Sequence, residues 1–365
     1  MKKILKLTLS LFLILSSLAL ACTGITIKTL DNKIVQGRTI EYGESNLNSK
    51  LVVSPRGKEY QSLTPDGKLA GYKWKGKYGY VGASLITDMF IGEGINEAGL
   101  NAGLFYFPHY GSLTKYDKKI SKKSIVDMQV VSWILSNFAT VDEVKEGLKK
   151  IKVVNIGYDE KGNPLPTAHW RVADSKGGNI VIEIVNNGEV KIHDNKIGVL
   201  TNSPDYQWHV KNLNNYINLY AGNAKNFNVN GQEFFSFGAG TGAMGLPGDI
   251  TPPSRFVRAF YFLNTMKPAE TSKEAINEAF HILNNFDLPI GVEYPAEHKS
   301  YIPKDLPSAT QWTAISSLND REFYYKTMYN SQIRKVDLKK IDFSTVKYTV
   351  LPLDEKPEEN NHTSW

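Results

Sequence analysis

The sequence is poor in cysteine, with Cys22 as its single one among 365 residues. A lone cysteine cannot form a disulfide within its own chain, and it excludes zinc sites built from several cysteines. The seven histidines show neither an H-E-x-x-H motif nor another paired spacing, so we assign no metal site. His169 and His209 each adjoin a tryptophan, and we interpret both as core histidines.

The chain also lacks a large excess of charge of either sign. The chain has 43 Lys and Arg against 37 Asp and Glu, and half of the net charge of +6 comes from Lys2, Lys3 and Lys6. Basic residues do not alternate with aromatic ones in any run, so we expect no nucleic acid partner. With 41% hydrophobic and 22% charged residues, the composition is that of a globular protein with a sizeable core.

Long apolar runs are missing after residue 21, and none reaches the ~18 residues expected of a membrane-spanning helix. Residues 1–21 have the features of a secretory signal peptide, with basic residues first, an apolar stretch next and an A-x-A cleavage site ending at Ala21. We therefore predict an exported protein, periplasmic or secreted, without stable membrane insertion. The mature domain is expected over 22–353, followed by a polar tail over 354–365.

Cys22 would be the first residue after cleavage, which leaves three interpretations open. A bacterial lipoprotein carries a diacylglycerol on such a cysteine, although Ala19 stands where leucine is usual. A free cysteine is also often simply buried. As a nucleophile, an N-terminal cysteine carries its own base, because its α-amine has a pKa of about 7.7–8.0 and can take the thiol proton.

The residues after Cys22 predict a β-hairpin. Residues 22–29 and 33–41 alternate in the manner of strands, and Asp31-Asn32 is typical of a two-residue turn.

This predicted register puts Glu41 opposite Cys22. Arg38 then points to the other face of the hairpin, unless a bulge at Gly37 redirects it. A carboxylate, and with a bulge also a guanidinium, is thus expected near the thiol.

The remaining pattern predicts an α+β protein with layered antiparallel sheets, because regular βαβ crossovers are missing. Helices are expected over 123–138, 141–150 and 272–285, the second with a capping box that begins at Thr140. The expected strands cover 179–185, 189–193, 197–201, 312–317, 322–329 and 332–337.

Two later segments are candidates for a site. Asn202 ends an apolar strand, so its amide can point into a cavity. The glycine-rich segment 238–249 precedes Arg255 and lacks the Gly-Lys-Ser/Thr ending of a phosphate-binding loop.

Taken together, the ordered motifs resemble the choloylglycine hydrolase family, which contains conjugated bile salt hydrolases and penicillin V acylases. The resemblance extends from Cys22 to about Leu338. It rests on Cys-Thr-Gly at 22–24, Gly-Arg-Thr-Ile-Glu at 37–41, Gly-Ile-Asn-Glu-Ala-Gly-Leu at 94–100, Gly-Val-Leu-Thr-Asn-Ser-Pro at 198–204, Gly-Leu-Pro-Gly-Asp at 245–249 and Ser-Arg-Phe at 254–256.

The resemblance implies the four-layer αββα sandwich of N-terminal-nucleophile hydrolases, commonly as a homotetramer, and a reaction that needs no cofactor. It implies Cys22 as the nucleophile and Arg38 beside the thiol, favouring the thiolate. Asn202 falls at the family's oxyanion-hole asparagine, and Arg255 at its late active-site arginine.

Two positions depart from the family's commonest pattern. Glu41 stands where aspartate is usual, and we expect it to hold the α-amine in place of that residue. Tyr106 stands where bile salt hydrolases have asparagine; a tyrosine there resembles penicillin V acylases, and its backbone N–H still suits an oxyanion hole.

These features predict an amidase that cleaves a linear amide bond of a small N-acyl compound such as phenoxymethylpenicillin. Conjugated bile salts and N-acyl homoserine lactones are further possible substrates of the same chemistry. Two competing hypotheses are an envelope lipoprotein with a binding role and a family member that Glu41 has made inactive.

Overall fold

The computed structural model describes residues 20–42, 46–159, 162–165, 167–289, 292 and 310–354. Of the predicted signal peptide only Leu20 and Ala21 fall within these ranges, and the predicted tail lies outside them beyond Asp354. Asp354 itself accepts a hydrogen bond of 2.7 Å from the Thr327 hydroxyl and pairs with Arg334.

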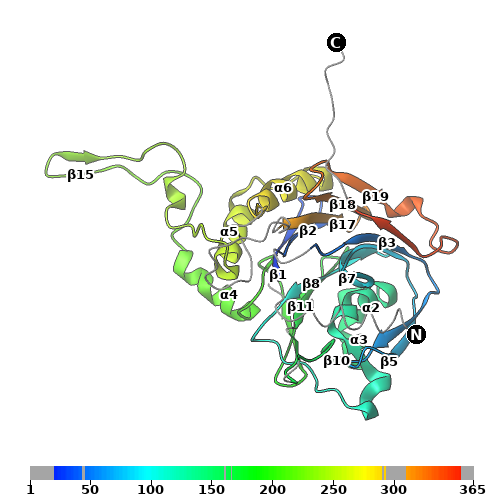
Figure 1. Cartoon of the computed structure of the whole chain (residues 1–365). Helices are drawn as coiled ribbons and strands as arrows, with labels where there is room; N and C mark the ends of the chain where they lie inside the picture. The colour runs from blue at the N-terminus through cyan, green and yellow to red at the C-terminus, as the bar shows by residue number, and fades with distance from the viewer. Residues whose placement is uncertain are drawn as a thin grey trace.

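The first of two large sheets carries the N-terminal hairpin at its centre, and all its neighbouring strands are antiparallel (Figure 1). In spatial order its strands are β14 (Val199–Leu200), β1 (Leu20–Lys28), β2 (Ile34–Tyr42), β17 (Thr310–Ser317), β18 (Glu322–Thr327) and β19 (Arg334–Asp337).

The second large sheet is also antiparallel throughout. In spatial order its strands are β13 (Glu189–Asp194), β12 (Asn179–Val185), β11 (Ala168–Asp174), β8 (Leu100–Tyr106), β7 (Thr87–Asn96), β6 (Tyr80–Leu85), β3 (Lys50–Ser54) and β20 (Thr349–Pro352).

Helices cover the outer face of each sheet, which gives four layers and confirms the predicted αββα sandwich. Helices α5 (Pro252–Thr265) and α6 (Ser272–Asn284) pack on β1 and β2, whereas α2 (Val130–Asn137) and α3 (Val141–Leu148) pack on the second sheet (Figure 1). Both sheets bury aliphatic and aromatic side chains between them and beneath the helices, so the core is continuous through the sandwich.

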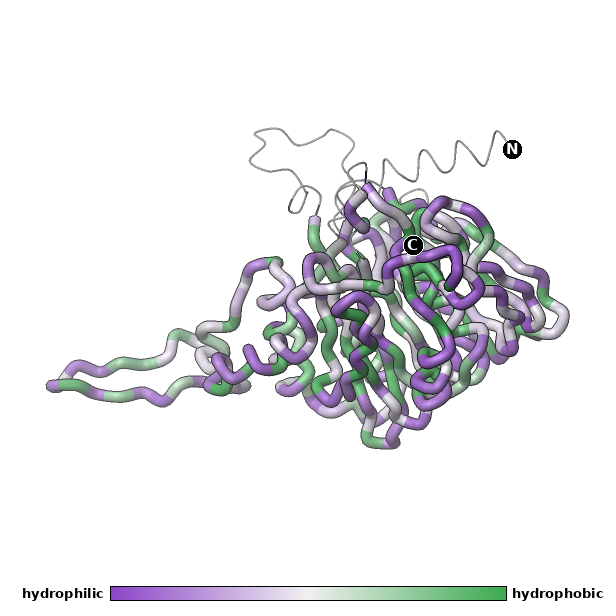
Figure 2. Tube along the Cα trace, turned by 90° about the horizontal axis from the view of Figure 1, so that it is seen from below, coloured by the Kyte–Doolittle hydropathy of each residue, from purple (hydrophilic) through white to green (hydrophobic). Residues whose placement is uncertain are grey.

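The described residues also form three small two-stranded sheets and one further short α-helix. They are β4 (Glu59–Leu63) with β5 (Leu69–Lys75), β9 (Ser124–Val126) with β10 (Lys152–Val154), β15 (Phe227–Val229) with β16 (Gln232–Phe234), and α4 (Tyr206–Asn212). We call residues 224–240, which include β15 and β16, the arm, because they extend far from the body (Figures 1 and 2).

The predicted register of the hairpin was wrong by one residue. Three residues, Leu30, Asp31 and Asn32, form its loop, because the Thr29 N–H donates to the Lys33 carbonyl. Asn32 has a φ of 62°, in the left-handed region that asparagine tolerates. A three-residue loop that ends in a left-handed residue is a common hairpin connection.

The longer loop shifts every pair between β1 and β2. Cys22 pairs with Ile40, and Glu41 pairs with Ala21. Arg38 lies two residues before Ile40, so strict alternation puts it on the same face as Cys22. The pairing is continuous along both strands, and a bulge at Gly37 is not needed.

The predicted helix over 123–138 began too early. Ser124–Val126 form β9, a strand parallel to β10, and the α-helix begins only at Val130. The helix predicted to begin after Thr140 is confirmed, because the Thr140 side chain accepts a hydrogen bond from the Glu143 N–H. Helix α5 had no counterpart in the prediction, although Pro252 and Pro253 in its first turn are typical of a helix start.

Candidate active site

Cys22 and Arg38 face the second sheet. On the same face, a Cβ atom at Gly24 would lie 2.6 Å from the Phe105 ring of β8, so the missing side chain lets the sheets approach. Both Cys22 and Arg38 are buried, with exposed fractions of 1% and 0%. The Nη2 atom of Arg38 donates to Cys22 Sγ over 2.6 Å, and its other nitrogens donate to the carbonyls of Thr39, Gly92 and Leu104.

The electrostatics of the thiol are set first by burial. Burial raises the pKa of Cys22 to about 11, Arg38 and Arg255 act in the opposite direction, and Glu41 adds to the rise. Arg38 thus favours the thiolate as expected, but burial outweighs its effect, so a base must take the thiol proton before Cys22 can attack.

Asn202 contacts the backbone nitrogen of Cys22. It follows β14, the edge strand beside β1, so its side chain reaches the start of β1. Its Oδ1 accepts hydrogen bonds of 2.8 Å from the Cys22 nitrogen and from Arg255 Nη2. Its Nδ2 donates to the Tyr106 carbonyl, also over 2.8 Å.

Arg255 reaches the same point from the helical layer. It lies in the first turn of α5, and its Nη1 donates to the Cys22 carbonyl over 2.5 Å and to the Thr23 hydroxyl over 3.0 Å. Asp249 accepts hydrogen bonds from the Ser254 and Thr251 hydroxyls and from the Thr251 N–H, which lowers its pKa to about 2. The end of the glycine-rich segment therefore holds the start of the helix that carries Arg255.

Glu41 is also fully buried, but it lies on the helical side of the first sheet. Its Oε2 is 3.8 Å from Arg255 Nη1. Asn202, rather than Glu41, supplies the hydrogen-bond acceptor found for the Cys22 nitrogen. The prediction that Glu41 holds the α-amine thus stays a prediction, and the observed neighbour of its carboxylate is Arg255.

Tyr106 ends β8, and its backbone forms a hydrogen bond with the Cys22 thiol that lowers the thiol pKa. Its half-buried side chain lines a cavity of about 640 Å³ together with Pro108, Leu113, Tyr158 and Leu165. The five other predicted site residues therefore lie around Cys22, and of the six Tyr106 alone lines this cavity.

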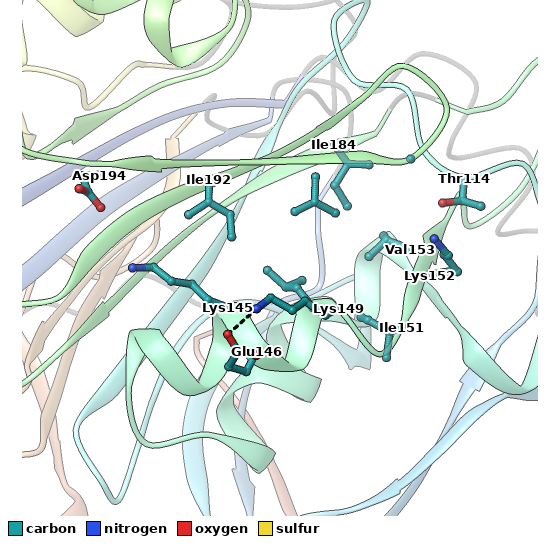
Figure 3. A pocket seen from close by; sticks show the side chains of 13 residues that line it. Thr114, Lys145, Glu146, Lys149, Ile151, Lys152, Val153, Ile184, Ile192 and Asp194 are labelled. Atoms are coloured by element: carbon teal, nitrogen blue, oxygen red, sulfur yellow. Dashed lines mark hydrogen bonds and ion pairs between the residues drawn. The ribbon is translucent and has the colours of Figure 1, made fainter.

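Another cavity of about 640 Å³ lies apart from these residues. It is bounded by α3 and by the hairpin of β12 and β13, with Ile184 and Ile192 opposite Lys145 and Lys149 (Figure 3). None of the six predicted site residues lines it. Among the described residues, no group of His, Cys, Asp or Glu is arranged to hold a metal ion, and no helix has the length and apolarity to cross a bilayer.

The sequence analysis missed two buried charges beside Arg38. Glu93 of β7 has one carboxylate oxygen 3.9 Å from Arg38 Nη1 and the other 3.3 Å from Arg171 Nη2. Arg171 of β11 donates to the carbonyls of Ile25 and Gly37, a pair in the hairpin. The available signal was a single charged residue within a short run of apolar residues and glycines, Phe-Ile-Gly-Glu-Gly-Ile at 90–95 and Trp-Arg-Val-Ala at 170–173.

Comparisons with known proteins agree with this geometry. A model of the family described as linear amide C–N hydrolases, choloylglycine hydrolase family, matches residues 22–351. The chain is 36% identical over 321 residues to the bile salt hydrolase/transferase of Clostridium perfringens, covering 87% of this chain and 93% of that protein. It is 25% identical over 375 residues to the penicillin V acylase of Pectobacterium atrosepticum, covering 94% and 88%.

Solved structures show the same fold. A cysteine-to-alanine variant of the conjugated bile acid hydrolase from Clostridium perfringens superposes with a TM-score of 0.77 at 31% identity, covering 93% of this chain and 99% of that one. The penicillin V acylase from Agrobacterium tumefaciens shares the fold with a TM-score of 0.70 at 24% identity, covering 90% of each chain.

The fold is thus that of the N-terminal-nucleophile hydrolases. Within this class, the chain belongs to the choloylglycine hydrolase family and is a hydrolase of linear amide C–N bonds.

Proposed function

We propose that the protein is an exported amidase whose nucleophile is Cys22, made N-terminal by removal of residues 1–21. One arrangement carries the proposal: the sulfur and the nitrogen of Cys22 have separate partners. Sγ accepts from Arg38 over 2.6 Å, while the nitrogen donates to Asn202 over 2.8 Å. The two groups that must exchange a proton are therefore held in fixed positions.

In the first step, the α-amine of Cys22 takes the thiol proton, and Sγ attacks the amide carbon of the substrate. A bond forms between sulfur and carbon, and the carbonyl oxygen becomes an oxyanion. We assign the Asn202 amide and the Tyr106 backbone N–H as the donors to this oxyanion, and a donor of this kind is worth about 3–4 kcal/mol in the transition state. The C–N bond then breaks, and the leaving amine receives the proton from the α-ammonium group.

In the second step, water hydrolyses the resulting thioester. The α-amine takes a proton from the water, whose oxygen bonds to the acyl carbon as the C–S bond breaks. The acid leaves and the thiol is restored, so the cycle is balanced without a cofactor.

The burial of Cys22 argues against the lipoprotein hypothesis. Its sulfur lies between the two sheets, with an exposed fraction of 1% for the residue and Arg38 in contact. A diacylglyceryl group on this sulfur would have to occupy the packed core, which supports the amidase over the lipoprotein.

For the acyl group, we propose a flat aromatic acid such as that of phenoxymethylpenicillin. Substrate choice depends on the residues of the pocket more than on identity along the whole chain. The side chain of Tyr106, one of the site residues, lines the cavity beside Pro108, and Tyr158 lines it as well. Conjugated bile salts are the second candidate, favoured by the relative at 36% identity and by the volume of about 640 Å³.

For the assembly, we propose a homotetramer in which the arm contacts another copy. Phe227, Phe235 and Phe237 on the arm are 61%, 62% and 89% exposed, and exposed apolar patches of large side chains mark interaction surfaces. Light scattering should give the mass of four chains for the wild type and a smaller species for a Phe235→Asp/Phe237→Asp double variant. Ile333→Asp, at an exposed site away from the arm, is the control and should stay tetrameric.

The test of the function is the intact mass of the exported protein, with and without substrate quenched in acid. The expected mass begins at unmodified Cys22 and gains one acyl group with phenoxymethylpenicillin or with a conjugated bile salt. The adduct identifies the acyl group, and Cys22→Ala should lose it. A diacylglycerol on Cys22, or a chain that begins before it, would contradict the proposal.

A further inference from the structure

Two buried histidines contact the backbone at Asn202 and at the residue before it. The Nε2 atom of His169 is 3.0 Å from the Thr201 carbonyl oxygen, and that of His209 is 2.9 Å from the Asn202 carbonyl oxygen. Two imidazole rings thus contact the carbonyls of successive residues. The second of these residues is the one whose side chain contacts the Cys22 nitrogen.

The hydrogen bond to Asn202 fixes the tautomer of the His209 ring. A carbonyl can only accept a hydrogen bond, so Nε2 of His209 carries a hydrogen. Burial lowers the pKa of His209 to about 4, so the ring is neutral at neutral pH and its Nδ1 carries none. Within the described residues, Nδ1 has no hydrogen-bond partner, which leaves the bond to Asn202 as the polar contact of this buried ring.

The same ring also contacts the segment that carries Arg255. His209 stacks on Phe256, with ring centroids 4.7 Å apart and an angle of 11° between the planes. Phe256 follows Arg255 in α5, and both are fully buried. His209 therefore joins two separate segments, the one that ends β14 and the first turn of α5.

We propose that His209 is a positioning residue for amide hydrolysis, which fixes Asn202 relative to Arg255 and to the Cys22 nitrogen. This inference rests on the proposed function, in which Asn202 orients the α-amine and stabilises the oxyanion. Oδ1 of Asn202 accepts from both Cys22 and Arg255 at 2.8 Å, so a displacement of its backbone changes both contacts.

The expected effect is on catalysis rather than on substrate binding. His209 does not line the cavity beside Tyr106, so KM should change little. A displacement of about 1 Å at reacting groups can cost about 100-fold in rate. We therefore expect kcat to fall about 10- to 100-fold when the hydrogen bond to Asn202 is lost.

Two substitutions of His209 separate the hydrogen bond from the packing. His209→Phe keeps a ring that can stack on Phe256 but removes the donor, and His209→Gln restores an N–H donor at a similar reach. His281→Phe, at an exposed position on α6, is the matched control. Each variant is measured as the mature chain for kcat, KM, thermal midpoint and the rate of Cys22 alkylation.

If His209 positions Asn202, His209→Phe should have a lower kcat but an unchanged KM and alkylation rate. The kcat of His209→Gln should recover in part, and His281→Phe should behave like the wild type. An unchanged kcat in folded His209→Phe would overturn it, as would a His209→Gln variant that is no better. If His209→Phe does not fold, Phe256→Leu is the substitute, because it loosens the stacked ring and should also lower kcat alone; an unchanged kcat there overturns the proposal equally.

Cys22→Ala and Asn202→Ala, measured in parallel, separate this inference from the function on which it rests. If either retains full activity, the proposed function fails, whatever His209 does. If both abolish activity while His209→Phe remains fully active, only the inference about His209 fails.

Discussion

The Nη2 atom of Arg38 lies 2.6 Å from Sγ of Cys22, and both residues belong to a single β-hairpin. The guanidinium is fully buried and also donates to three backbone carbonyls, so its position is determined by the strands around it. Among the effects that lower the thiol pKa, that of Arg38 is the largest, although burial raises the pKa by more.

Removal of this guanidinium should make the thiol less reactive. In Arg38→Leu, the pKa of Cys22 should rise further above about 11, so the thiolate fraction at pH 8 should fall about 10-fold or more. The measurement is the rate of iodoacetamide alkylation of the mature chain between pH 7 and pH 10. Arg56→Leu, which removes a half-exposed guanidinium paired with Glu97, is the control. Equal alkylation rates in both variants would contradict the role of Arg38.

Activity should depend on a free nitrogen at Cys22. A chain that begins at Ala21 keeps this nitrogen in a peptide bond, and the loss of a general base costs about 100-fold or more in kcat. The chain that begins at Cys22 should lose kcat/KM as the pH falls below about 7.7–8.0, because the α-amine becomes protonated. Comparable turnover by the two chains would show that another group is the base.

Glutamate at position 41 should support catalysis better than aspartate would. Its carboxylate lies 3.8 Å from Arg255, and Glu41→Asp would draw the carboxylate back by about 1 Å, which can cost up to about 100-fold in rate. We expect kcat with phenoxymethylpenicillin to fall in this variant. A large gain instead would mean that glutamate compromises the site and that the wild-type enzyme is weak.

A buried carboxyl group should make stability depend on pH. Burial raises the pKa of Asp127 to about 7, against about 3.9 in the unfolded chain. Its contribution is fully present below about pH 4 and is lost as the pH rises to about 7, because the unfolded chain releases the proton first. The loss amounts to at most about 4 kcal/mol.

Asp127→Asn should remove this dependence. Oδ1 of the new amide can still accept from the Met128 and Ile156 N–H groups, which now donate at 3.0 and 3.1 Å. The free energy of unfolding in urea should differ less between pH 5 and pH 8 in the variant than in the wild type. The contributions of the other titrating groups are shared by both proteins and cancel in that comparison. Parallel losses in both proteins would exclude Asp127 as the cause.

The fold class and the residues of the site were accessible from the sequence, because the motifs around Cys22, Arg38, Asn202 and Arg255 occur in a recognisable order. The register of the hairpin was not. Leu30 is apolar and resembles a strand residue, yet it lies in the loop with 66% of its surface exposed. The left-handed φ of Asn32 allows this longer loop, and neither property follows from alternation of residue types.

Contacts across the layers were also out of reach. His209 and Glu93 act on the site from other elements, and their partners are 7 and 55 residues away in the sequence, so local pattern could not connect His209 with Asn202 or Glu93 with Arg38. The two histidines were interpreted as core residues, which is correct for their burial. Only the fold reveals that they lie behind Asn202.

The three-residue loop at Leu30 to Asn32 has a consequence for redesign of the hairpin. Surface loops usually tolerate insertions and deletions. An altered loop that keeps the pairs between β1 and β2 leaves Arg38 beside Cys22. A loop that makes the strands slip by one residue inverts the faces of all side chains in β2 and turns Arg38 to the helical layer. A change in this exposed turn can therefore alter the thiol's surroundings although every residue around the thiol stays the same.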